Sequence, residues 1–306
     1  MNSFCFFLFL LLVPVATTSL PLGKQSPTTG GNVFLTVTVT DDYGRPIPGL
    51  KREQFSVWEK KASLEITSFE AEAAPASVAF VIDLSGSMRA RSKNPAAQVA
   101  EQVRRGISRA SDYLIVSFSD TPQVVCGLGC SETEAAKALN DLAQAHAHQN
   151  TALYDACDLV LRDLQFSKHT KRVLIVVSDG QDNSSKLSFN QLRDELKGSS
   201  VTFYAVSLLS TADAGSGLGQ EGIGILDELS AVTGGKAYFP HDRKEMIEIA
   251  DVIALQINQH YTLGFKPLAQ IPDQKWHSIK IKFEFPKTSG KHPHYDLRYR
   301  AGYYSR

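Results

Sequence analysis

Hydrophobic and polar residues follow two different patterns along the chain. In residues 30–73 they alternate, as in NVFLTVTVT and FSVWEKK, which predicts antiparallel strands with one buried face. Between residues 77 and 209 the hydrophobic residues form four short continuous runs: SVAFVID, DYLIVSFS, RVLIVVSD and VTFYAVSLL. Such runs are typical of strands that are buried on both faces. From residue 260 to residue 304 the alternation returns, in YTLGFKP, HSIKIKFEFP and YDLRYRAGYY.

Helix-length segments separate the continuous runs: NPAAQVAEQVRRGISRA, SETEAAKALNDLAQA, TALYDACDLVLRDL and SFNQLRDELKG. Ser131 and Glu134 predict a capping box at the start of the second segment, and Gly198 ends the fourth. Two more helices are predicted in GIGILDELSAVTG and RKEMIEIADVIALQINQ, with the short strand KAYFP between them. Alternating strands and helices predict an α/β fold, with a doubly wound, mostly parallel sheet flanked by helices.

The two alternating segments at the chain ends each contain too few strands to bury an apolar face alone. We therefore expect residues 30–73 and residues 260–304 to form the N-terminal and C-terminal halves of one small antiparallel β domain. The α/β domain, residues 75–258, is then inserted between these halves.

Residues 1–20 contain an apolar run from Phe4 to about Ala16, followed by small and polar residues. The run is short for a membrane span, so it predicts a secretory signal peptide. No Lys or Arg precedes it, and an uncleaved membrane anchor is the alternative. In both cases we expect an exported protein, either periplasmic, in the cell envelope or secreted, with membrane contact only through such an anchor.

Charge and cysteine content narrow the function classes. The 32 Lys and Arg residues balance 32 Asp and Glu residues, so no overall positive field attracts nucleic acid. Loss of Cys5 with the signal peptide leaves Cys126, Cys130 and Cys157. In VCGLGC, Cys126 and Cys130 form either a disulfide bond or a pair of small buried residues; the sequence leaves both open.

Oxygen-bearing side chains collect where the predicted parallel strands end. Carboxyl ends of parallel strands share one edge of the sheet, where ligands bind. Oxygen ligands without His or Cys select a hard cation; Mg²⁺ fits best, and Mn²⁺ or Ca²⁺ are alternatives. The alternative to a metal site is that Ser85 and Thr151 are ordinary helix caps. The residues expected at this edge are Asp83, Ser85, Ser87, Thr151 and Asp179.

The sequence DLSGS, followed by a distant threonine and then by SDGQDN, resembles the metal-ion-dependent adhesion site of a von Willebrand factor type A (VWFA) domain. The pattern of that site is D-x-S-x-S, a distant T and a distant D, and the resemblance covers about residues 76–258. The flanking YTLGFKP and LRYRAGYY resemble VWFA-related proteins of acidobacterial type. The resemblance implies metal contacts from the hydroxyls of Ser85, Ser87 and Thr151, with Asp83 and Asp179 bound directly or through water.

One position departs from the family pattern: Asn150 stands where relatives usually have glycine. Asn tolerates left-handed backbone angles better than most residues, so the loop should keep its shape. Asp182 has no role in the pattern and is predicted to be a solvated loop acid.

The site predicts an exported, non-catalytic binding module that mediates metal-dependent protein–protein interaction or adhesion. Its partner would be a protein that offers an Asp or Glu carboxylate. The alternatives are a scaffold subunit of an envelope complex and, less favoured, a hydrolase that uses the cation as a Lewis acid. A hydrolase needs a general base, and the five site residues leave none free.

Other motifs have weaker support. GLGQEG, residues 217–222, matches a dinucleotide-binding pattern but lies far from the end of its strand, so a flexible surface loop is predicted. The histidines of HAH (146–148) and HPH (292–294) lack a third ligand and are predicted to be exposed.

Overall fold

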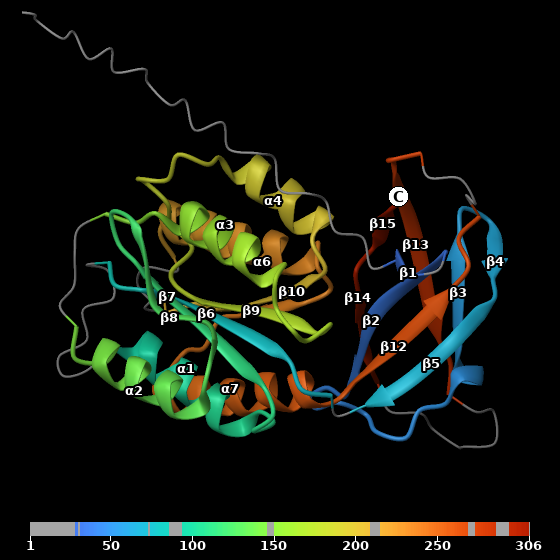
Figure 1. The fold of residues 1–306 in the computed structure, drawn as a ribbon, viewed down its shortest axis with the longest axis horizontal. Coiled ribbons are helices and arrows are strands. Elements are labelled where there is room, and N and C mark those ends of the chain that lie inside the picture. Colours follow the sequence, from blue (N-terminus) through green and yellow to red (C-terminus); the bar gives the residue numbers. More distant parts are fainter. Residues whose placement is uncertain are drawn as a thin grey trace, which may run out of the picture.

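The computed structural model describes residues 28–29, 31–72, 74–85, 94–145, 150–208, 215–268, 273–285 and 294–305. It has two units: a sheet covered by helices and, beside it, a pair of antiparallel sheets (Figure 1). The predicted signal peptide, residues 1–20, lies outside the described residues.

A six-stranded sheet forms the centre of the larger unit, in the order β11-β10-β9-β6-β7-β8. Five strands are parallel, and β8 pairs antiparallel with β7. The strands are β6 (Ser77–Asp83), β7 (Asp112–Phe118), β8 (Pro122–Cys130), β9 (Arg172–Val177), β10 (Val201–Val206) and β11 (Lys236–Tyr238). The mostly parallel sheet confirms the predicted fold class.

Helices cover both faces of this sheet (Figure 1). Phe80 and Ile82 of β6 pack into one hydrophobic cluster, whereas Ala79 and Val81 pack into the other. This two-sided burial explains the continuous apolar runs. One face carries α1 (Pro95–Gly106), α2 (Glu132–Leu142) and α7 (Arg243–Asn258), and the other carries α3 (Leu153–Leu164), α4 (Phe189–Gly198) and α6 (Gly217–Ala231).

The sequence correctly predicted the start of α2 and the end of α4. Ser131 and Glu134 form the predicted capping box of α2, and α4 ends at Gly198.

The prediction for GLGQEG was wrong: residues 217–222 form the first turns of α6 rather than a flexible loop. Ser216 caps this helix by accepting a hydrogen bond from the Gly219 amide, which offsets the low helix propensity of the glycines.

The smaller unit consists of two antiparallel sheets around a shared hydrophobic core. Each sheet combines strands from both ends of the chain: β2 pairs with β12, and β3 pairs with β13. The first sheet contains β1 (Thr28–Thr29), β2 (Asn32–Thr40), β5 (Ile66–Glu72), β12 (His260–Phe265) and β14 (Asp296–Tyr299). The second contains β3 (Phe55–Glu59), β4 (Ala62–Leu64), β13 (Trp276–Phe283) and β15 (Gly302–Tyr304), and a short 3-10 helix, η1 (Arg52–Gln54), precedes β3.

The segment YDLRYRAGYY forms two strands in different sheets, β14 and β15. Arg300 lies between them and points into the larger unit, where its guanidinium donates hydrogen bonds to the carbonyl oxygens of Leu196, Lys197 and Val201 at 2.8–2.9 Å. Burial lowers the pKa of Arg300 to about 10. Two of these bonds reach carbonyl groups in the last turn of α4, where backbone acceptors commonly lack an intrahelical partner, and the third reaches the first residue of β10.

A disulfide bond joins Cys126 to Cys130 within β8. Opposite these residues, β7 pairs through Tyr113 and Ile115, so β8 has extra residues that form a bulge. Cys157 is a buried free thiol whose pKa is raised by burial.

Among the described residues, the helices are all too short or too polar to cross a membrane.

Candidate functional site

The candidate site lies at the point where the winding of the sheet reverses. Strand β6 is flanked by β7 on one side and by β9 on the other. The chain moves outward from β6 to β8 and then returns to the opposite side of β6 at β9. In doubly wound sheets such a switch point opens a crevice at the carboxyl ends of the strands, and ligands bind there.

Four of the five predicted residues lie at this edge. Asp83 is the last residue of β6, with Ser85 just beyond it, and Asp179 follows the end of β9 by two residues. Thr151 reaches the same edge because the next residue, Ala152, donates its amide to the Ser119 carbonyl beyond β7, at 2.7 Å. Ser87 lies in residues 86–93, outside the described residues.

Asp83 is fully buried at the base of the site. Its Oδ1 accepts a hydrogen bond from the Ser85 amide at 2.7 Å, and its Oδ2 accepts one from the Ser178 hydroxyl at 2.6 Å. Burial raises the pKa of Asp83 to about 6, against the opposing effect of its hydrogen bonds. The negative charge of Asp179 contributes to the same rise. The two carboxylates therefore interact electrostatically.

The two hydroxyl-bearing residues at the edge are also buried: Ser85 is 2% exposed and Thr151 5% exposed. The Ser85 hydroxyl hydrogen-bonds to the Asp83 carboxylate. A hydroxyl that donates its proton to a carboxylate keeps its oxygen lone pairs for another partner, such as a cation.

Thr151 is held by the loop that follows β9. Its amide donates to Asn183 Oδ1 at 2.8 Å. Its carbonyl oxygen accepts the amides of Asn183 and Ser184, at 3.0 and 3.1 Å. Because the same loop carries Asp179, these bonds connect two of the predicted ligand residues.

Asp182 is not the solvated loop acid that the sequence predicted. Its carboxylate accepts hydrogen bonds from the Tyr154 amide at 3.0 Å and from the Ser185 amide at 3.1 Å. Helix α3 begins after Ala152, which has no capping side chain. Asp182 therefore caps α3 from a distant loop, and local sequence offers no signal for this role.

Helix α6 approaches the site through glycine. A Cβ atom on Gly180 would lie 2.4 Å from the Gly222 carbonyl oxygen, and Gly180 itself has a φ of +83°. Both conditions require glycine at residue 180.

The donor set at this edge fits a hard divalent cation. The described residues contain no cluster of three or more His, Cys, Asp and Glu side chains able to hold a metal, so a metal here would depend on hydroxyl groups as well. Asp83 and Asp179 supply two buried carboxylates. The Ser85 amide and the Ser178 hydroxyl donate to Asp83 without bringing a positive charge. A cation would offset the cost of burying two like charges.

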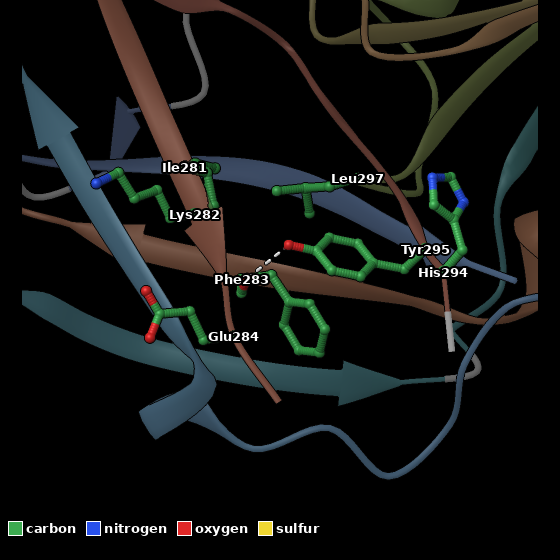
Figure 2. A pocket seen from close by; sticks show the side chains of 7 residues that line it. All are labelled: Ile281, Lys282, Phe283, Glu284, His294, Tyr295 and Leu297. Atoms are coloured by element: carbon green, nitrogen blue, oxygen red, sulfur yellow. Dashed lines mark hydrogen bonds between the residues drawn. The ribbon is translucent and has the colours of Figure 1, made fainter. Parts of the chain in front are cut away.

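Of the two histidine motifs, the structure describes only residue 294, which lies on the antiparallel unit. His294 is exposed, with its Nδ1 2.8 Å from Asp42 Oδ1, whereas His146, His148 and His292 lie outside the described residues. A pocket on the antiparallel unit contains none of the site residues (Figure 2). It is lined by Ile281, Lys282, Phe283, Glu284, His294, Tyr295 and Leu297.

Similarity to known structures concerns the fold. The proximal thread matrix protein 1 of the mussel byssus is 16% identical, with a TM-score of 0.51 over 63% of this chain and 49% of that one. The manganese-loaded TRAP protein of Plasmodium vivax is 14% identical, with a TM-score of 0.49 over 76% of this chain and 96% of that one.

One curated relative, an uncharacterized protein of Borreliella burgdorferi, is 28% identical over 145 residues. The match covers 46% of this chain and 42% of the relative. The chain thus spans less than half the length of both this relative and the mussel protein.

The family comparison covers the unit that carries the candidate site. Residues 77–250, more than half of the chain, match the family model described as the von Willebrand factor type A domain. This range begins with β6 and extends into α7, so it includes the whole six-stranded sheet and the edge with Asp83, Thr151 and Asp179. The chain belongs to the von Willebrand factor type A domain family.

Proposed function

We propose that this protein is an exported, non-catalytic binding module that uses a hard divalent cation, most favourably Mg²⁺, to bind an acidic side chain of a partner protein. The observation that carries the proposal is the pair of interacting buried carboxylates, Asp83 and Asp179, beside two buried hydroxyl-bearing residues. The residues assigned to the cation are Asp83, Ser85, Ser87, Thr151 and Asp179.

The charge balance of the site supports this function. The two carboxylates offset the two charges of the cation, while the serine and threonine hydroxyls are neutral. Because the hydroxyl ligands add no further negative charge, a bound Mg²⁺ would keep its Lewis acidity and could accept one further oxygen ligand. An Asp or Glu carboxylate from a partner provides that oxygen, and the charged contact makes it stronger than a neutral ligand.

A metal-dependent hydrolase has less support, because hydrolysis needs a general base in addition to the metal ligands. Asp155 and Asp182 are acids beside the Thr151 loop, and Asp155 already accepts the amides of Lys186 and Leu187. Asp182 already accepts the amides of Tyr154 and Ser185 and the Ser185 hydroxyl. A scaffold subunit of an envelope complex would use the same metal site and differ only in its partner.

The first test measures binding of Mg²⁺ to the full chain by calorimetry. Thr151→Ala removes a proposed ligand, and Asp83→Asn keeps the volume of the buried side chain while removing its charge. Each should lower the affinity by more than about tenfold. Thr170→Ala and Asp227→Asn, at exposed positions, are matched controls that should bind as the wild type does. Equal affinity in all five proteins would overturn the metal site.

The second test is capture of a partner from native envelope extracts, with Mg²⁺ or with EDTA. The wild type and both controls should retain a partner only with Mg²⁺, and the two site variants should not retain it. Capture that persists in EDTA would contradict the mechanism. Metal-stimulated ester hydrolysis that is lost in Thr151→Ala would instead favour the hydrolase.

Export is tested separately, by mass spectrometry of the mature N-terminus. Cleavage near residues 16–20 is expected. A retained Met1 in membrane fractions would indicate the anchor.

A further inference from the structure

The loop after β9 and the start of α3 are joined by a closed ring of hydrogen bonds. The Thr151 amide donates to Asn183 Oδ1 at 2.8 Å, and the Asn183 amide donates back to the Thr151 carbonyl at 3.0 Å. Both backbone groups of Thr151 are thus bonded to the same residue. Because a threonine side chain has a restricted χ1 angle, fixing the Thr151 backbone also limits the positions that its hydroxyl can take.

Further bonds hold the same two segments together. The Asp155 carboxylate accepts the amides of Lys186 and Leu187, at 2.9–3.1 Å, and the Asp155 amide donates to the Ser185 hydroxyl at 3.0 Å. Asp182 accepts the Tyr154 amide at 3.0 Å. The loop and the first turn of α3 are therefore connected at several points. The Ser184 amide also donates to the Thr151 carbonyl, and the Asn183 side chain accepts the Thr151 amide.

The connection matters because the proposed ligands come from separate parts of the chain. Asp179 and Asn183 belong to the loop after β9, whereas Thr151 precedes α3. A metal site needs its ligands at set distances, and residues that orient the ligands commonly affect affinity by about ten- to hundredfold.

We infer that Asn183 is a positioning residue of the metal site, which holds Thr151 in place relative to Asp179 so that the two ligands act as one unit. The inference rests on the proposed function. Asn183 does not itself need to contact the cation.

The side-chain chemistry of Asn183 allows a sharp test. The interaction with the Thr151 amide needs only an acceptor oxygen, which an aspartate also provides. Alanine lacks that oxygen but keeps the backbone amide that donates to the Thr151 carbonyl. Asn183→Asp should therefore preserve the positioning, and Asn183→Ala should remove it. Asn190→Ala, at an exposed position in α4, is the matched control.

The experiment titrates Mg²⁺ into the full-length wild type and the three variants by calorimetry, and measures amide hydrogen exchange of Thr151 in EDTA. We expect Asn183→Ala to weaken Mg²⁺ about ten- to hundredfold and to expose the Thr151 amide to faster exchange. Asn183→Asp should bind within about threefold of the wild type or more tightly, because it keeps the acceptor and adds a negative charge. The control should match the wild type in both measurements.

Three results would contradict the inference. If the wild type binds Mg²⁺ and Asn183→Ala binds it equally well, positioning by Asn183 is wrong while the proposed function stands. Asn183→Asp could protect the Thr151 amide as the wild type does and still bind Mg²⁺ as weakly as Asn183→Ala. In that case the hydrogen bond to the Thr151 amide does not control Mg²⁺ affinity. If the wild type itself binds no Mg²⁺, the proposed function is wrong and the inference falls with it.

Discussion

A Cβ atom placed on Gly222 would lie 2.3 Å from the carbonyl oxygen of Asp179. Helix α6 thus packs directly on the backbone of a residue in the candidate metal site. Two residues further along the same helix, Gly224 has open space where its Cβ would lie. The two glycines therefore form a natural pair for testing how this contact supports the site.

Gly222→Ala should lower the free energy of unfolding by about 1–3 kcal/mol, because the added methyl group forces the helix and the Asp179 loop apart. It should also weaken Mg²⁺ binding. Gly224→Ala should raise the free energy of unfolding by about 0.5–1 kcal/mol, because alanine favours the helix and meets no atoms. Urea unfolding and calorimetry measure these effects. Two variants of equal stability would show that the close contact is unimportant.

The Ser178 hydroxyl has two roles beside the site. It donates to Asp83 Oδ2 at 2.6 Å and accepts the Gly180 amide at 3.1 Å. Ser178→Ala removes both bonds within a fully buried region, so the free energy of unfolding in EDTA should fall by about 1–3 kcal/mol. Ser63→Ala, at an exposed position in β4, should change it by less than about 0.5 kcal/mol. Similar values for both serine variants would contradict this role.

The domain division predicts the behaviour of fragments. Residues 75–258 should fold alone, because they contain the complete six-stranded sheet and its helices. Residues 1–74 should not, because strands β2 and β3 pair with β12 and β13 from the other end of the chain. The larger fragment lacks Arg300 and loses its hydrogen bonds to the Leu196 and Lys197 carbonyls. Circular dichroism during urea unfolding tests both fragments, and a cooperative transition in residues 1–74 would rule out the shared β domain.

The antiparallel unit contains a pH-sensitive ion pair network. His277 Nδ1 lies 2.8 Å from Glu59 Oε1, and its Nε2 lies 3.0 Å from Asp273 Oδ1. Burial lowers the pKa of His277, but the hydrogen bonds and charges of these two carboxylates outweigh it, and the net shift is upward from 6.5. The folded state therefore binds this proton more tightly than the unfolded state does.

His277→Gln should remove this contribution to stability. Because the folded pKa is raised, the contribution is complete below the ordinary pKa of 6.5 and is lost as pH rises through the folded pKa. The difference in unfolding free energy between wild type and variant should thus be larger at about pH 5.5 than at about pH 9. Urea unfolding at both pH values gives the difference, and a constant or rising difference would contradict the assignment.

The sequence was sufficient to predict the α/β unit and four residues that meet at its edge. The continuous apolar runs of β6, β7, β9 and β10 reflect burial on both faces, which is encoded within each strand. Asp83 and Asp179 could be placed together because parallel strands end on one edge of a sheet, whichever residues pack around them.

Other features required the tertiary structure, because each depends on a partner far away in the chain. Strand β8 was not predicted, since an exposed edge strand such as PQVVCGLGC lacks a regular hydrophobic pattern. Asp182 caps α3 across 28 residues, and Arg300 reaches α4 across about a hundred. Local sequence indicates which residues favour a strand, a helix or a turn. The contacts of Asp182 and Arg300 depend instead on packing between distant segments, which only the complete fold brings together.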